Sequence, residues 1–148
     1  MASSETGGTV SVYRIVSPRW TASAFSGEGA QKYGGRWNSP GRRVVYTAGS
    51  RALAALEMLV HLTTPGSRSK PYSIIEVTLP LEQIQEIGST AHPVQAGDDW
   101  LKSGSSLALR VPSIIIPEEP NYLINPEHPA FAELRIGKPS PFGFDSRM

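Results

Sequence analysis

The fold is decided between residues 44 and 62, where the chain reads VVYTAGSRALAALEMLVHL. The apolar run from Val44 to Thr47 predicts a short buried strand. Ser50 is a suitable N-cap for a helix over Arg51 to Leu62, which the turn at residues 63–66 ends. Because this helix is apolar around much of its circumference, we expect it to lie deep against a sheet.

Outside this stretch, the pattern favours strands and loops over helices. Alternation of apolar and polar residues predicts further β-rich runs at residues 10–16, 73–79, 107–111 and 113–116. The glycine-rich segment from Arg19 to Arg43 indicates a long ordered loop, since its aromatic residues can bury area. Leu81 to Ile87 fits a short turn of helix, and the many prolines after Val111 allow only extended segments and turns.

These elements predict an α+β fold, a single sheet-rich domain with a central buried helix. We expect residues 1–9 to form a flexible tail and residues 10–148 to form the domain. No internal repeat or second domain is visible in the 148 residues. A chain of this length buries a sufficient core without disulfides or metals.

Composition excludes several classes of function. Lys+Arg number 14 and Asp+Glu 13, and this net charge of +1 gives no direct attraction to nucleic acid. Cysteine is absent, so no disulfide, thiolate zinc site or cysteine nucleophile is expected. No apolar stretch approaches the roughly 20 residues of a membrane helix. The first residues do not resemble a secretory signal. We therefore expect a cytoplasmic protein that contacts neither membrane nor nucleic acid.

Glu57 is the first candidate for chemistry. On a helix, its neighbours on the same face are Leu53, Ala54, Val60 and His61, so we expect a largely desolvated carboxylate. An internal salt bridge to an arginine explains such a residue equally well. A metal held by Glu57 and His61 is disfavoured, because no third ligand pattern accompanies them.

Arg36 and Arg14 are candidate anion ligands. Arg36 follows the pair Gly34-Gly35, which lets the backbone pass close to a ligand, and its guanidinium can grip a phosphate with two hydrogen bonds. Arg14 lies within a predicted strand, where a half-buried cation needs a carboxylate or a ligand as partner. Tyr46 ends the Val44-Val45 run and can stack on a flat ring, although plain core packing is the commoner role.

Ser113 and Asn125 are weaker candidates. No Gly-x-Ser-x-Gly elbow surrounds Ser113, so a hydroxyl contact to a ligand is more credible than a nucleophile, and a backbone hydrogen bond is the plainer alternative. Asn125 belongs to the polar segment 121–129, whose Asn-Pro and His-Pro pairs are turn formers. Rossmann and P-loop glycine motifs are both missing.

These residues resemble the RES-domain family, named for an arginine, a glutamate and a serine. The resemblance rests on blocks spread over nearly the whole chain: Tyr13-Arg14-Ile15, Gly34-Gly35-Arg36-Trp37-Asn38, Val45-Tyr46-Thr47, Leu56-Glu57, Val111-Pro112-Ser113, residues 121–129 and Phe144-Asp145-Ser146-Arg147. It implies that Arg36, Glu57 and Ser113 are the namesake residues. It also implies that Arg14, Tyr46 and Asn125 belong to the pocket for NAD+.

The resemblance further implies a fold similar to ADP-ribosyltransferases and the role of toxin in a bacterial RES–Xre toxin–antitoxin pair. The activity would be cleavage of NAD+ by hydrolysis or phosphorolysis, with NAD+ as substrate and no separate cofactor. The partner would be a helix-turn-helix antitoxin of the Xre type, and oligomers are expected only together with it. Modification of a protein target, a non-catalytic nucleotide-binding module and a plain interaction protein remain alternatives.

These residue types also permit a mechanism. Nicotinamide leaves NAD+ as a neutral group, so the barrier lies in the positive charge that develops on the ribose. A carboxylate from Glu57 can stabilise that charge while Arg14 and Arg36 hold the diphosphate. Tyr46 would pack on nicotinamide and Ser113 would contact the adjoining ribose. The sequence leaves the acceptor open among water, phosphate and a protein side chain.

Overall fold

The computed structural model describes residues 7–148 and contains one eight-stranded sheet, in the order β4-β5-β6-β2-β1-β3-β7, with β8 also paired to β3. Neighbouring strands are antiparallel except for the parallel pair β4–β5. The strands are β1 (Thr9–Val16), β2 (Val45–Ala48), β3 (Tyr72–Pro80), β4 (Ile84–Glu86), β5 (Ala108–Pro112), β6 (Pro120–Ile124), β7 (Arg135–Ile136) and β8 (Ser140–Phe142).

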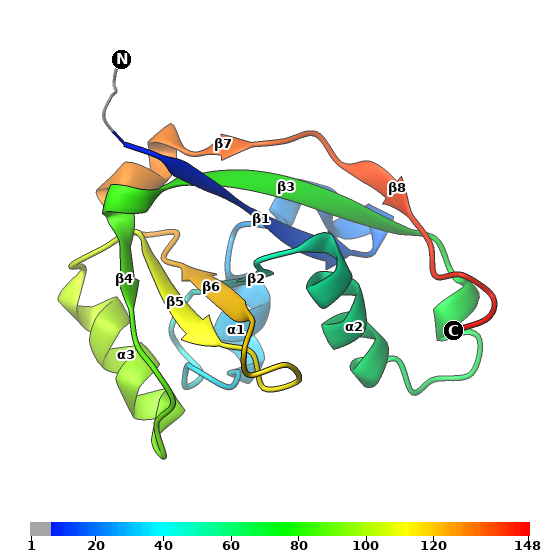
Figure 1. Ribbon diagram of the computed structural model, residues 1–148, viewed down its shortest axis with the longest axis horizontal. Helices are drawn as coiled ribbons and strands as arrows, with labels where there is room; N and C mark the ends of the chain where they lie inside the picture. Colours follow the sequence, from blue (N-terminus) through cyan, green and yellow to red (C-terminus); the bar gives the residue numbers. More distant parts are fainter. Residues whose placement is uncertain (1–6) are drawn as a thin grey trace.

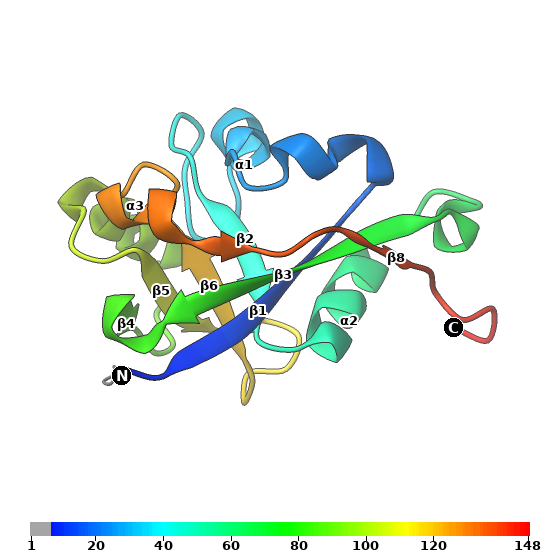
Figure 2. The ribbon, with the colours of Figure 1, turned by 90° about the horizontal axis from the view of Figure 1, so that it is seen from above.

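The α-helices of the described residues lie below the long strands β1 and β3 (Figure 1). They are α1 (Glu28–Tyr33), α2 (Arg51–His61) and α3 (Pro93–Ser103), with the short 3-10 helices η1 (Pro18–Ser23), η2 (Ser67–Ser69), η3 (Leu81–Gln83) and η4 (Pro129–Glu133). Seen from above, α1 and α3 lie on one side of the crossing strands β1 and β3, and α2 lies on the other (Figure 2). The predicted α+β, sheet-rich architecture is confirmed.

The core forms where apolar residues of β1 and β3 meet those of β5 and β6. Ile75, Val77 and Leu79 of β3 are at most 2% exposed, as their alternation predicts. They share a cluster with Val12 of β1 and with the buried ends of β5 and β6. A second cluster brings Trp37, Val44 and Leu123 against Trp100 of α3. This second cluster connects the loop before β2 to a helix far away in sequence.

Helix α2 follows the sequence closely, although it is buried less completely than expected. The Ser50 side chain accepts a hydrogen bond from the Leu53 amide at 3.1 Å, which is the predicted N-cap. Within the helix only Leu53 and Ala54 are fully buried. The helix packs one face on β1 and β2 and leaves another face, with Glu57 and His61, to line a cavity.

Three predicted segments differ in the structure. Residues 113–116 form a loop, because the Ser113 hydroxyl accepts the amides of Ile115 and Ile116 at 3.1 and 3.2 Å, a local bond that competes with strand pairing. The expected loop at 121–129 begins instead as strand β6. Residues 81–87 hold η3 and then β4, so only their start is helical.

The N-terminal half also departs from the prediction. Residues 19–43 contain most of η1 and all of α1, because left-handed glycines at 27 and 34 bound α1 rather than prevent it. Thr9, assigned to the tail, is the first residue of β1, and residues 1–6 of that tail lie outside the described part. Helix α3 was not predicted, although Pro93 near its start and Gly104 after its end are typical helix boundaries.

The packing around Gly97 of α3 leaves no room for a side chain. A Cβ atom at this position would collide with the backbone carbonyl of Trp37. We therefore expect Gly97→Ala to lower the free energy of unfolding by about 3 kcal/mol, the upper part of the range for overpacking, in urea titrations. Gly88→Ala is the matched control, because a Cβ atom there would have no neighbour within 4 Å and stability should be unchanged. Equal midpoints for the two variants would contradict the close contact.

Candidate functional site

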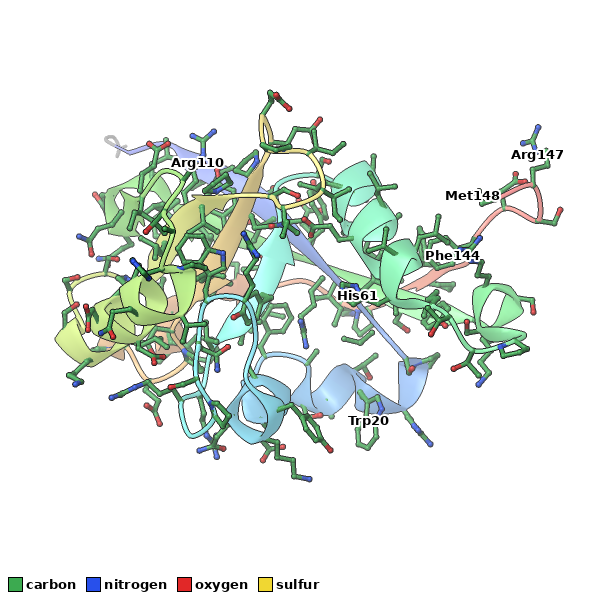
Figure 3. All side chains as sticks on the ribbon, turned by 90° about the horizontal axis from the view of Figure 1, so that it is seen from below. Trp20, His61, Arg110, Phe144, Arg147 and Met148 are labelled. Atoms are coloured by element: carbon green, nitrogen blue, oxygen red, sulfur yellow. The ribbon has the colours of Figure 1, made fainter. Side chains whose placement is uncertain are left out.

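One large cavity opens between α1, α2 and the strands β1 and β2. Its volume is about 780 Å³, which lies in the usual range for small-molecule sites. Figure 3 shows the molecule from below, with His61 at the end of α2 on the side of η1 and α1 and Arg110 far from it. Among the residues lining this cavity are Arg14, Arg36, Tyr46, Glu57, His61 and Asn121. Arg36 and Glu57 therefore face one shared space.

The Glu57 carboxylate is held by two donors from distant parts of the chain. Its Oε2 accepts the hydroxyl of Ser113 at 2.6 Å, and its Oε1 accepts the side-chain amide of Asn121 at 2.8 Å. Asn121 also donates to the carbonyl of Thr47 at 3.3 Å. Each oxygen of Glu57 retains further acceptor capacity. The carboxylate is thus fixed in direction while it lines the cavity.

This arrangement excludes one of the alternatives posed for Glu57, the internal salt bridge. The described residues contain two ion pairs, Arg51–Glu76 and Arg147–Asp145, and neither involves Glu57. The internal salt bridge is therefore not the reason for its position. The expectation of a desolvated carboxylate was wrong in degree, because Glu57 is half-buried and reaches the cavity surface. No group of three or more His, Cys, Asp or Glu residues in the described chain is arranged to hold a metal.

Ser113 stands behind Glu57. Its side chain is buried, with 2% of the residue exposed, and it does not line the cavity. The hydroxyl donates to Glu57 while it accepts the two amides of the following loop. The plainer alternative, a serine that bonds backbone, is therefore present together with a bond to the acid. Ser113 is placed to orient Glu57 rather than to touch a ligand.

Arg14 brings a buried cation to the cavity. Its Nε donates to the carbonyl of Ala24 at 2.8 Å and its Nη1 to the carbonyl of Tyr46 at 3.1 Å. No carboxylate of the described residues pairs with it. Burial lowers the pKa of the Arg14 guanidinium, because the charged form loses contact with water. An anion in the cavity would supply the missing partner.

Arg36 sits at the tip of a tight turn. The Gly35 amide donates to the Asn38 carbonyl at 3.0 Å, so Arg36 and Trp37 form the two central residues of the turn. A Cβ at Gly35 would lie 2.6 Å from the Tyr46 hydroxyl, and only glycine fits there. Arg36 itself is exposed and lines the cavity, while Trp37 is buried. The glycine pair therefore serves the close packing of the turn.

Tyr46 supports this turn from the sheet. Its hydroxyl accepts the Trp37 amide at 2.9 Å and donates to Asn38 Oδ1 at 2.7 Å. Burial raises the pKa of the Tyr46 phenol to about 12, with a smaller contribution from the negative charge of Asp98. Since the hydroxyl is occupied by the turn, the part of Tyr46 available to a ligand is the ring.

Asn125 is not brought to the cavity. It is buried, its Oδ1 accepts the Glu127 amide at 3.0 Å and its own backbone amide donates to the Leu107 carbonyl at 2.9 Å. This is the turn-forming role that its Asn-Pro context favours. Asn121, treated in the sequence only as part of a turn-forming segment, instead holds Glu57. A strand at 120–124 places alternate side chains on one face of the sheet. The prolines around this segment made the alternation difficult to predict from the sequence.

Tyr13 and His61 also line the cavity without having been assigned a role. The Nδ1 atom of His61 lies 2.8 Å from the Glu57 carbonyl. Because a carbonyl only accepts hydrogen bonds, Nδ1 is the donor in this contact. The helical spacing of four residues from Glu57 was the signal for this neighbour.

Comparisons with known proteins give matches over most of the chain. Residues 11–145 match the family described as the RES domain. The chain is similar to the protein named Toxin Res of Yersinia enterocolitica, with 37% identity over 93% of this chain and 98% of that protein. It is 38% identical, over 95% of this chain and 97% of the other, to the Prs ADP-ribosylating toxin of a Sphingobium species.

Solved structures give a fold match at low identity. The crystal structure of the MbcT–MbcA toxin–antitoxin complex of M. tuberculosis contains a chain that aligns with a TM-score of 0.72 and 14% identity. The alignment covers 93% of this chain and 86% of that one. At this level of identity, the comparison concerns the fold.

No helix of the described part is long and apolar enough to cross a bilayer.

The Tyr46 hydroxyl predicts a pH-dependent stability. Because the pKa of the folded phenol is raised from 10.0 to about 12, the folded state keeps a proton that the unfolded state loses. This stabilisation is present below pH 10 and is lost as the pH rises to about 12. We expect a loss of about 1 to 2 kcal/mol in the free energy of unfolding, discounted because the phenol is only partly buried.

Tyr46→Phe should remove that part of the pH dependence in urea titrations. At neutral pH the variant should be less stable by about 1 to 3 kcal/mol, since the Trp37 amide and Asn38 Oδ1 lose their partner. Tyr33→Phe is the control, because the Tyr33 ring is 81% exposed. If Tyr46→Phe and the wild type lose stability in parallel above pH 10, Tyr46 is not the titrating group.

Proposed function

The chain belongs to the RES domain family, and we propose that it is the toxin of a toxin–antitoxin pair that cleaves NAD+ at the bond between nicotinamide and ribose. One observation carries the proposal. A carboxylate oriented by two distant donors shares a cavity with a buried guanidinium that has no acidic partner in the described chain. An anionic substrate with a carbon that becomes positive matches both groups.

Glu57 would act on the reacting sugar. As the bond from C1′ to the nicotinamide nitrogen breaks, its electron pair leaves with nicotinamide and positive charge develops on the ribose. A carboxylate already fixed in position stabilises this charge without reorganising. Ser113 and Asn121 supply that fixed position through the two carboxylate oxygens. We assign Glu57 as the catalytic residue and Ser113 as a positioning residue.

Arg14 and Arg36 would bind the diphosphate. Arg14 offers from the sheet a buried charge that no carboxylate of the described residues pairs with, and Arg36 offers an exposed fork from the turn. A planar guanidinium binds phosphate oxygens with two hydrogen bonds, which gives direction as well as charge. Tyr46 would pack its ring on nicotinamide, as a flat aromatic surface at the cavity wall. Asn125 has no place in this arrangement because it lies away from the cavity.

The acceptor is water or phosphate in this proposal. In either case an oxygen atom of the acceptor attacks C1′ and forms the new carbon–oxygen bond as nicotinamide leaves. Water releases a proton in this step, whereas phosphate attacks through an ionised oxygen. Transfer to a protein side chain is the second candidate function, favoured by the similarity to a relative named as an ADP-ribosylating toxin. Incubation with NAD+, with and without phosphate, separates hydrolysis from phosphorolysis. Incorporation of labelled ADP-ribose into protein detects the transferase.

The same proposal includes a protein partner and a location. The structural neighbour was crystallised as a toxin–antitoxin complex, which supports an antitoxin for this chain. We propose that this antitoxin is of the helix-turn-helix Xre type, that oligomers form only with it, and that the pair acts in the cytoplasm. NAD+ serves as the substrate, with no separate cofactor. Release of free nicotinamide by the purified chain distinguishes this enzyme from a module that only binds nucleotide.

Replacement of Glu57 tests the catalytic assignment. Glu57→Gln keeps an acceptor for Asn121 and a side chain of the same shape, so the fold should be nearly unchanged. The rate of nicotinamide release should fall by about 100-fold or more, as when a preorganised charge is removed. Glu133→Gln, on the exposed end of η4, is the matched control and should retain activity. Full activity in Glu57→Gln would reject the assignment.

Replacement of Arg36 tests the diphosphate contact. Arg36→Lys keeps the charge but loses the planar fork, so the dissociation constant for NAD+ should rise by about tenfold, the equivalent of one charge-assisted hydrogen bond. Calorimetry in the Glu57→Gln background avoids turnover of the ligand. Arg110→Lys, exposed on β5 and remote from the cavity, should bind as the parent does. Unchanged affinity in Arg36→Lys would show that the two-bonded contact is absent.

A further inference from the structure

Helix α3 touches the turn that carries Arg36 but contributes no residue to the cavity. The helix lies on the other side of the turn, at the edge of the sheet next to β4 and β5 (Figure 1). Its Gly97 allows the backbone to approach the Trp37 carbonyl, and its Trp100 shares a buried cluster with Trp37. The turn is therefore packed between the cavity and α3.

Asp98 makes the polar connection between these two parts. Its Oδ1 accepts the Ser39 amide at 3.0 Å and its Oδ2 accepts the Ser39 hydroxyl at 2.6 Å. Hydrogen bonds to a carboxylate are stronger than those between neutral groups. Both oxygens are engaged by one residue that is 59 positions away in sequence. No ion pair involves Asp98 within the described residues.

Ser39 directly follows the residue that closes the turn. Asn38 is 1% exposed, and its side-chain amide donates to the carbonyls of Ala30 and Ser39 at 3.0 Å each. Its Oδ1 accepts the Tyr46 hydroxyl. The turn is thus fixed from the sheet through Tyr46 and from α3 through Asp98. Removal of Asp98 takes away the polar support from α3 and leaves the backbone at 35–39 with its bonds to Tyr46 and Ala30 and its packing on Trp100.

Arg36 depends on this backbone for its direction. Its side chain makes no hydrogen bond or ion pair with the other described residues. A shift of the turn would therefore move the guanidinium directly. We propose that Asp98 is a positioning residue that holds the Arg36 turn in place for an anionic substrate. The substrate in this inference rests on the proposed function.

The binding experiment compares four proteins in the Glu57→Gln background by calorimetry with NAD+: the parent and three variants. Asp98→Ala should raise the dissociation constant by about tenfold, the equivalent of the charge-assisted hydrogen bond that a displaced Arg36 would lose. Asp98→Asn keeps an acceptor for the Ser39 amide and should bind within about twofold of the parent, since the neutral amide preserves the geometry. Asp99→Ala is the control, because Asp99 is exposed and, among the residues that the structure describes, bonds only Gln95 of its own helix.

A double variant distinguishes an effect of Asp98 on Arg36 from a general loss of structure. If Asp98 acts through Arg36, Asp98→Ala should cause no further loss of NAD+ affinity in the Arg36→Ala variant. Additive losses in the double variant would overturn the inference. NAD+ affinity of Asp98→Ala equal to that of the parent would overturn it as well. The midpoint of urea unfolding, measured for each variant, shows whether the protein is folded under the conditions of the titration.

Hydrogen exchange tests whether Asp98 holds the turn in place, even if NAD+ is not the substrate. Asp98→Ala should speed amide exchange across residues 34–41 by about tenfold, because the turn opens locally, while β3 exchanges as in the wild type. Absence of NAD+ binding by the wild type would overturn the proposed function and leave this measurement unaffected. Unchanged exchange at 34–41 in Asp98→Ala would overturn the role of Asp98.

Discussion

The hydrogen bonds that hold the Glu57 carboxylate are the interaction on which the rest of the site depends. The donors come from the loop after β5 and from strand β6, while the acid comes from α2. An acid held in this way needs no counter-charge, so it keeps its affinity for a developing cation. The antiparallel pairing of β5, β6 and β2 places Ser113 and Asn121 beside the helix. The sheet therefore determines the direction of the carboxylate.

The two cations of the cavity are built in different ways. Arg14 is fixed within β1 by carbonyls of η1's C-cap and of β2, so its charge is buried and its position is rigid. Arg36 projects from a turn, and its position is only as rigid as the supports of that turn. Tyr46 connects the two sites, since its carbonyl binds Arg14 and its hydroxyl binds the turn. One residue of β2 thus coordinates the geometry of both cations.

Two glycines at and beside the turn allow close packing of the backbone at a cost in local stability. Gly35 and Gly97 are each required because a side chain would collide with Tyr46 or with the Trp37 carbonyl. A glycine loses more backbone entropy on folding than other residues do, and both helix α3 and the turn carry this cost. Burial of the Trp37 and Trp100 rings offsets it. This arrangement places the exposed Arg36 directly before two buried residues, Trp37 and Asn38. The cavity wall is accordingly part of the second core cluster.

The sequence by itself determined the elements whose signals are local. The Ser50 cap, the helix at 51–61 and the alternation in β3 need only neighbouring residues, and the family blocks marked Arg36 and Glu57. Tertiary structure alone decided that Ser113 and Asn121 hold Glu57, that Asn125 lies elsewhere and that Asp98 reaches Ser39. These contacts join residues up to 64 positions apart. Their geometry follows from strand order and helix packing, which no local spacing in the chain records.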